Sequence, residues 1–125
     1  MFPPTPSPSP GWGGEIPTVP VDYDPASDGA AILLFSMDSC PWCIRLEPVM
    51  KTVAATLGSV VPVYKVGPES PLTNALGVSG FPTIVYVNDL GVTSKFEGER
   101  TADAIVSFVC HATAAKNSVC TKYFS

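Results

Sequence analysis

Two cysteines, Cys40 and Cys43, are the residues of this sequence whose type and spacing are best suited to chemistry. Two residues separate them, so both sulfur atoms are within reach of a single disulfide bond. In such a pair one thiol can attack a disulfide and the other can resolve the product. Zinc would need two more ligands from Cys110, Cys120 or His111, and these spacings are unlike those of a zinc ribbon or finger. We therefore expect no metal at these residues.

The sequence around this pair predicts a strand before it and a helix after it. Residues 30–35 are a continuous apolar run, as in a strand buried on both faces. Residues 41–57 repeat apolar side chains with helical spacing; Pro48 is expected to kink this helix and Gly58 to end it as a C′ residue. Free N–H groups and the positive end of the dipole at a helix start lower the pKa of a thiol there. We therefore expect the first cysteine to be the reactive thiolate and the second to be more shielded.

The rest of the chain predicts an α/β fold with a mixed sheet of four strands, or five at most, flanked by helices. Further strands are expected over residues 60–66, 83–87 and 92–97, with a short helix over 70–76 and a last helix from about Thr101. The first two strands, which the long helix joins, should be parallel neighbours or near neighbours, and the last two should form an antiparallel hairpin. A fifth strand could come only from residues 19–23.

The last helix carries an apolar stripe with a cysteine beside it. The residues expected to be buried are Ile105, Phe108, Val109 and Ala112. Cys110 lies next to this stripe, so we expect it near the surface. Cys120 follows ten residues later, and the two cysteines either form a second disulfide that folds the tail onto the helix or remain free thiols. A bridge would indicate an oxidising environment, or packaging for one.

A proline, Pro82, stands at the entrance to the strand over residues 83–87. Proline cannot donate to a strand ladder, and in a tight turn it often follows a cis peptide bond. We therefore predict a cis bond between Phe81 and Pro82, with the backbone groups of Phe81 free to bind an extended peptide. Trp42 and Phe81 are expected to be exposed beside each other, as a platform for substrate side chains.

With these features in place, the sequence resembles the thioredoxin superfamily from about residue 30 to residue 114. The matching features are the cysteine pair at a strand-to-helix junction, Pro48 five residues after the second cysteine, the loop over residues 80–83 and the final helix. The resemblance implies a thioredoxin-like fold and a thiol-disulfide oxidoreductase acting on protein disulfides and dithiols. Under it, Cys40 and Cys43 are catalytic, and the substrate-binding residues are Pro41, Trp42, Phe81 and Pro82.

The two motifs resemble different subfamilies of this superfamily. The sequence of residues 40–43, Cys-Pro-Trp-Cys, is similar to glutaredoxins, whereas residues 80–83, Gly-Phe-Pro-Thr, are similar to thioredoxin and disulfide-isomerase domains. The Gly-Gly turn that helps glutaredoxins to bind glutathione is absent, so no cofactor is predicted and glutathione stays an alternative. An iron–sulfur cluster bridged between two glutaredoxin-like chains is another alternative.

The sequence departs from thioredoxin at the buried acid that takes the proton of the resolving cysteine. Leu34 occupies that position, and the lysine that pairs with the acid falls at about Val63. Cys43 must therefore lose its proton by another route. Glu47, four residues after Cys43, and water are the candidates for a proton relay.

Composition and the ends of the chain limit the partners that are expected. The 125 residues are 46% hydrophobic and carry a net charge of −4, which fits one folded domain and excludes a nucleic-acid binder by bulk electrostatics. No apolar run reaches the roughly 18–20 residues of a membrane span. No signal peptide is readable, so a cytoplasmic location is expected.

The chain is expected to divide into a Pro-rich arm (1–29), a thioredoxin-like domain (30–115) and a tail (116–125). The arm is either a disordered tail or a docking arm with Phe2 and Trp12 as apolar anchors. A docking arm supports an alternative function. The protein would then be a structural or assembly subunit, incorporated into a larger assembly through its arm, with redox activity secondary.

Overall fold

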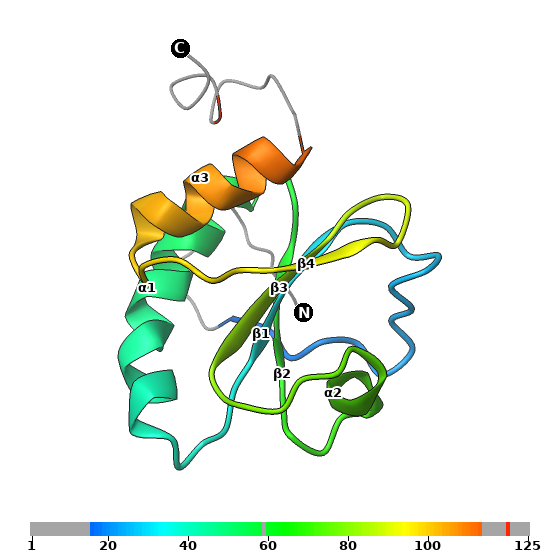
Figure 1. The fold of residues 1–125 in the computed structure, drawn as a ribbon, viewed down its shortest axis with the longest axis horizontal. Coiled ribbons are helices and arrows are strands. Elements are labelled where there is room, and N and C mark those ends of the chain that lie inside the picture. Colours follow the sequence, from blue (N-terminus) through cyan, green and yellow to red (C-terminus); the bar gives the residue numbers. More distant parts are fainter. Residues whose placement is uncertain (1–15, 59, 114–119, 121–125) are drawn as a thin grey trace, which may run out of the picture.

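Four strands form a mixed sheet at the centre of the computed structural model, with helices on both of its faces (Figure 1). The structure describes residues 16–58, 60–113 and 120. Its elements are β1 (Ala31–Phe35), α1 (Pro41–Leu57), β2 (Val63–Val66), α2 (Pro71–Ala75), β3 (Thr83–Val87), β4 (Thr93–Lys95) and α3 (Ala102–Thr113). The predicted mixed four-stranded sheet flanked by helices is confirmed.

The strands lie in the order β2-β1-β3-β4. β1 runs parallel to β2, and β3 runs antiparallel to both β1 and β4, as the sequence predicted. β1 occupies a central position because all five of its residues are apolar and buried. Its last residue leads through a short loop into α1, so the loop and the start of α1 lie at one end of the sheet.

β2 and β4 are shorter than predicted. β2 begins only after Pro62, which has no N–H to donate to the ladder. β4 begins at Thr93, because the side chain of Asn88 accepts two backbone hydrogen bonds from the turn that precedes the strand. Both strands are therefore limited by local features of the sequence.

The N-terminal part of the described chain adds a short contact to β2. Backbone hydrogen bonds join Lys65 to Pro17 at 2.8 Å and to Val19 at 2.9 Å. The predicted pairing of residues 19–23 is wrong beyond Val19, because a turn that starts at Pro20 takes the chain away from the sheet.

The predicted arm and tail are described only in part. From Ile16 onward the predicted arm packs on the domain, and Ile16 and Val19 are buried. Residues 1–15, with the predicted anchors Phe2 and Trp12, and the tail apart from Cys120 lie outside the described residues.

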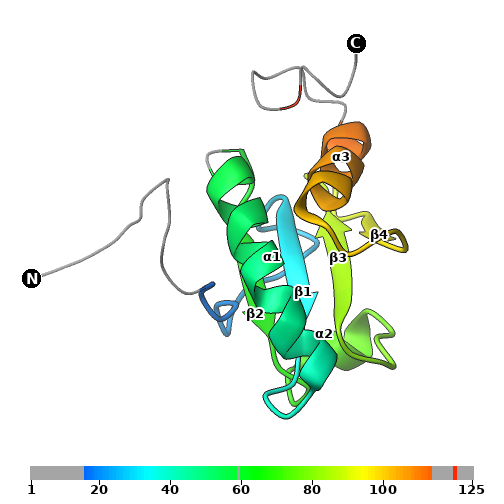
Figure 2. The ribbon, with the colours of Figure 1, turned by 90° about the vertical axis from the view of Figure 1, so that its left-hand side faces the viewer.

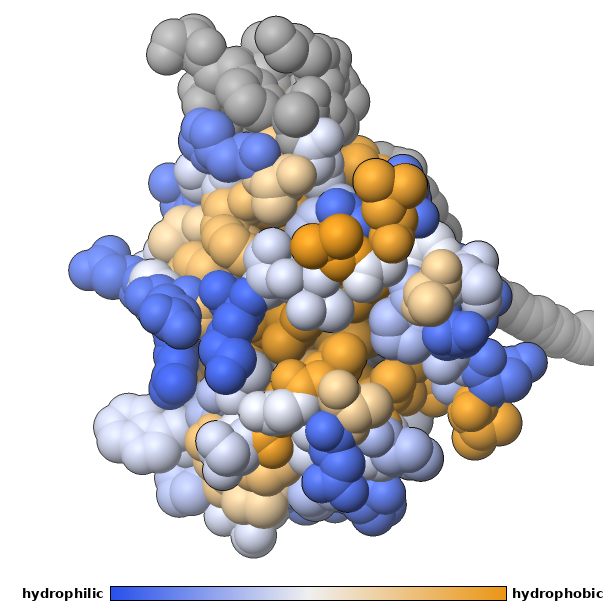
Figure 3. All heavy atoms as spheres, turned by 45° about the vertical axis from the view of Figure 1, so that its right-hand side comes forward, coloured by the Kyte–Doolittle hydropathy of each residue, from blue (hydrophilic) through white to orange (hydrophobic). Residues whose placement is uncertain are grey.

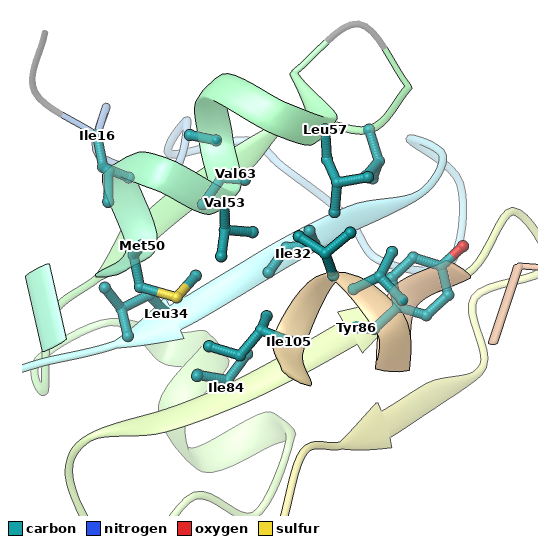
Figure 4. Packing of buried hydrophobic residues seen from close by; sticks show 14 of the residues in the cluster. Ile16, Ile32, Leu34, Met50, Val53, Leu57, Val63, Ile84, Tyr86 and Ile105 are labelled. Atoms are coloured by element: carbon teal, nitrogen blue, oxygen red, sulfur yellow. The ribbon is translucent and has the colours of Figure 1, made fainter. Parts of the chain in front are cut away.

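Two apolar clusters hold the three layers together. α1 and α3 cover one face of the sheet, and α2 covers the other (Figures 1 and 2). The larger cluster lies under α1 and α3 (Figure 4) and includes Ile32, Leu34, Met50, Val53, Leu57, Ile84 and Ile105. The second cluster lies on the α2 side and includes Ala31, Leu33, Phe35, Val66, Val85 and Val87. Alternate residues of β1 thus point into different clusters, which fixes the register of the strand.

The ends of the two long helices differ from prediction in detail. Gly58 has a φ of −60°, so it is right-handed and is not the expected C′ residue. In its place, the backbone N–H groups of Val60 and Val61 both donate to the carbonyl of Leu57 at 2.8 Å and satisfy the end of α1. In α3 the buried residues are Ile105, Val106, Val109 and Cys110, whereas Phe108 is half-buried and Ala112 is exposed.

Cys110 and Cys120 form a disulfide, with their Cα atoms 5.4 Å apart. The sequence left this pairing open. Both residues are buried, at 0% and 1% exposure, and both belong to the larger apolar cluster. The expectation that Cys110 lies near the surface is wrong, because the cross-link brings Cys120 against the same side of α3.

Candidate active site

Cys40 is the residue that begins α1. Its backbone is extended (φ −86°, ψ 115°) and its sulfur accepts a hydrogen bond from the backbone N–H of Cys43 at 3.1 Å. The carbonyl of Cys40 already accepts from the N–H of Ile44 at 3.0 Å. Cys40 is therefore an N-cap whose capping group is a sulfur atom, as the strand-to-helix junction predicted.

The environment separates the ionisation of the two thiols, which are both free and both buried. A hydrogen bond from the Cys43 side chain is the largest cause that lowers the pKa of Cys40, and the backbone N–H groups of the helix start and the charge of Arg100 add to it. Burial raises the pKa of Cys43, and its hydrogen bond to Cys40 raises it further. At a given pH a larger fraction of Cys40 than of Cys43 is thus in the thiolate form, and the attacking and resolving roles of the two thiols stay predictions.

Two groups that the sequence interpretation missed also act on Cys43. Hydrogen bonds from the backbone of Met37 and from the side chain of Ser36 favour its thiolate and oppose the rise in its pKa. Both residues lie in the loop that follows β1. The only signal that could have found them is their position at the carboxyl end of a buried strand.

The loop before β3 lies directly beside the N-cap. The peptide bond between Phe81 and Pro82 is cis, as predicted. The Cys40 sulfur lies 3.8 Å from the carbonyl oxygen of Phe81 and donates to it as a thiol. The expectation that both backbone groups of Phe81 are free is therefore wrong for the carbonyl, which contacts the sulfur. Pro82 itself is buried.

The exposed surface around Cys40 comes mainly from the start of α1. Trp42 is 58% exposed and Ile44 is 61% exposed. The guanidinium of Arg45 lies 4.9 Å from the centre of the Trp42 ring, which holds a positive charge beside this apolar surface. Pro41 is also exposed. Phe81, in contrast, is half-buried and packs against the second apolar cluster. The prediction that both aromatic rings are exposed is therefore wrong for Phe81.

Glu47 lies one turn after Cys43 and forms an ion pair with Lys65 of β2. Among the described residues, no hydrogen bond joins Glu47 to Cys43. Lys65 lies opposite Leu34 in the register of β1 and β2, whereas Val63 lies opposite Ile32. A lysine is therefore present beside Leu34, but its carboxylate partner is on the helix and not on the strand.

Nothing in the described ranges points to a metal or to a membrane span. No group of three or more His, Cys, Asp or Glu side chains there is arranged to hold a metal ion. No helix in the same part of the chain has both the length and the apolar character that crossing a bilayer requires.

Comparison with known sequences agrees with this geometry. The profile of the Thioredoxin family matches residues 23–111. Protein disulfide-isomerase A3 of Gallus gallus is 37% identical over 81 residues, which are 63% of this chain and 16% of that protein. Protein disulfide isomerase-like 1-5 of Oryza sativa is 38% identical over 100 residues, which are 73% of this chain and 18% of that protein. The chain thus spans less than a fifth of the length of these relatives.

Solved structures with the same fold include single thioredoxin domains. The first thioredoxin domain of mouse protein disulfide-isomerase A4 superposes with a TM-score of 0.62 at 28% identity, covering 70% of this chain and 65% of that domain. Chloroplastic thioredoxin z superposes with a TM-score of 0.60 at 27% identity, covering 70% of this chain and 81% of that protein.

Proposed function

Because the chain belongs to the thioredoxin family, we propose that it is a thiol-disulfide oxidoreductase that acts on protein disulfides and dithiols. The observation that carries the proposal is the position of the Cys40 sulfur. It caps the start of α1 through the N–H of Cys43 and lies next to the cis-proline loop. A thiolate is stabilised there, and an extended substrate can approach it.

In the reducing direction, the Cys40 thiolate attacks one sulfur of a substrate disulfide and the other sulfur leaves as a thiolate. The Cys43 thiol then loses its proton and its sulfur attacks Cys40. The substrate is released with two thiols, and Cys40 and Cys43 are left as a disulfide. The two cysteines carry both electrons, so the proposed reaction needs no cofactor. The oxidising direction is the reverse of these steps.

Glu47 is the proposed acceptor of the Cys43 proton. It lies one helical turn away, and its ion pair with Lys65 holds the carboxylate between α1 and β2. Because Glu47 makes no hydrogen bond to Cys43, we propose that a water molecule carries the proton between them. Pro41, Trp42, Phe81 and Pro82 are the proposed substrate-binding residues.

The direct test of these roles is covalent trapping. Cys43→Ser removes the resolving thiol, so Cys40 should hold protein partners as mixed disulfides that a reductant releases. Cys40→Ser is the matched control and should trap none. Trapping by Cys40→Ser and not by Cys43→Ser would reverse the two roles.

We also propose that the protein resides in, or is packaged for, an oxidising compartment. A disulfide such as Cys110–Cys120 persists mainly in such places. The test is rapid alkylation of the protein in intact cells of its source, followed by mass spectrometry. Alkylated Cys110 and Cys120 would indicate a reducing compartment.

One observation favours the alternative of an assembly subunit. Leu90 and Val92, in the turn at the end of the sheet opposite Cys40, are 84% and 57% exposed, and apolar patches lie between hydrophilic side chains on the face that Figure 3 shows. Alkylation at pH 6 separates the two functions. An oxidoreductase should react quickly at Cys40, whereas a rate like that of free cysteine favours the subunit.

A further inference from the structure

A groove adjoins the candidate active site between β3 and the chain that follows β4. It encloses about 290 Å³. Pro82, Thr83 and Ile84 line one side, and Lys95, Glu97 and Arg100 are among the residues of the other side. We call it the β3–β4 groove.

One end of the β3–β4 groove lies at Pro82, the residue after Phe81, whose carbonyl contacts the Cys40 sulfur. The distance from this carbonyl oxygen to the sulfur is 3.8 Å. The other end is at Lys95, which lies opposite Val85 in the ladder of β3 and β4. Val85 is three positions after Pro82 along extended chain, which is about 10 Å. The groove can therefore accommodate two or three residues of an extended polypeptide whose cysteine is bonded to Cys40.

The charge of the groove is opposite to that of the chain. Lys95 and Arg100 are exposed, and neither forms an ion pair with another described residue. Glu97 is the one acidic residue among those that line the groove. Two cations and one anion give a positive groove on a chain with a net charge of −4. The charge of Arg100 also acts on Cys40, so this side chain and the reacting sulfur share one electrostatic environment.

We propose, on the basis of the oxidoreductase function above, that the β3–β4 groove selects substrates with a carboxylate side chain two or three residues from the cysteine that bonds to Cys40. Lys95 and Arg100 would attract the carboxylate, and Glu97 would limit the preference. Exposed ion pairs of this kind correspond to a preference of about two- to fivefold, which added salt reduces.

The test is a competition between two peptide thiols that differ only in Glu or Gln at the third position from cysteine. The protein carries Cys43→Ser and starts as the mixed disulfide of Cys40 with 2-mercaptoethanol. A peptide thiolate attacks this disulfide and releases 2-mercaptoethanol, so no net oxidant is needed. Mass spectrometry measures the ratio of the two protein–peptide disulfides at equilibrium. Since both peptides react with the same Cys40, a change in its pKa cancels in the ratio.

Three further variants make the ratio informative. Lys95→Gln combined with Arg100→Gln should lower the Glu-to-Gln ratio by two- to fivefold, and Glu97→Gln should raise it. Lys51→Gln is the matched control, since it removes a lysine about 15 Å along α1 from the start of the helix and should leave the ratio unchanged.

The outcomes separate this inference from the proposed function. If both peptides exchange but the ratio responds to neither the groove cations nor Glu97, the oxidoreductase stands and the selection of acidic substrates is refuted. A ratio that falls equally with Lys51→Gln also refutes it, because the effect would then follow net charge. If neither peptide forms a disulfide with Cys40, the proposed function itself fails.

Discussion

Breaking the disulfide between Cys110 and Cys120 should lower the free energy of unfolding by about 2.7 kcal/mol. The cross-link joins α3 to the tail across a sequence separation of 10. For a loop of this length, the chain-entropy relation gives roughly 9 cal/mol/K, or about 2.7 kcal/mol at 25 °C, of restricted freedom in the unfolded chain. In a protein of this size the loss corresponds to a fall in Tm of about 10 °C.

The measurement compares the stability of one protein with and without the disulfide between Cys110 and Cys120. The protein carries Cys40→Ser and Cys43→Ser, so that the first cysteine pair does not contribute to the change in stability on reduction. Its urea unfolding is followed before and after reduction. The reduced form should unfold at a urea concentration about 1–2 M lower. Cys120→Ala in the same background is a second route to the unlinked protein and should be at least as unstable. A difference below about 1 kcal/mol in both experiments would refute the loop-closure reasoning.

The remaining predictions concern the thiols, the proton acceptor and one turn. Alkylation against pH should show Cys40 ionising below the free-thiol value of about 8.5 and Cys43 above it; Cys43→Ala should move Cys40 back toward that value, and an unmoved midpoint would contradict the hydrogen-bond cause. Because burial raises the pKa of Cys43, its thiol favours the folded state below the unfolded pKa, and this contribution should be lost as the pH rises through the folded pKa. Glu47→Gln should slow resolution of a mixed disulfide about a hundredfold near pH 7 in stopped-flow measurements, while an unchanged rate would assign the proton to water alone. Gly91→Ala should destabilise by about 1–3 kcal/mol in urea unfolding, because its φ is +82° and an added Cβ would lie 3.1 Å from the backbone of Ala26; Gly80→Ala, with open space around it, is the control and should change little.

The features that the sequence predicted well are those that local residues determine. A cysteine before a proline-led helix and a proline before an apolar strand were enough to predict the N-cap position of Cys40 and the cis bond at Pro82. The apolar run of β1 was enough to place that strand between two buried faces. Each of these signals spans only a few neighbouring residues.

The features that were wrong or missed depend on partners far along the chain. Helical spacing alone placed Cys110 beside the buried stripe, but its burial is shared with Cys120, which no periodic pattern connects to α3. The pairing of Glu47 with Lys65 depends on how α1 lies against β2, and the sequence contains no measure of that register. Ser36 has no distinguishing pattern, although its side chain reaches Cys43.

Other parts of the chain protect the outer strand of the sheet, β2, at Lys65. Its backbone N–H and C=O would otherwise be open at the edge of β2, where an unpaired strand is a template for joining the strand of another molecule. Pro17 and Val19 occupy both groups, and Pro62 leaves no N–H to offer just before the strand. Proteolytic removal of residues 16–19 would therefore leave the backbone N–H and C=O of Lys65 unpaired at the edge of β2. A chain cut there should be prone to pair with copies of itself along β2.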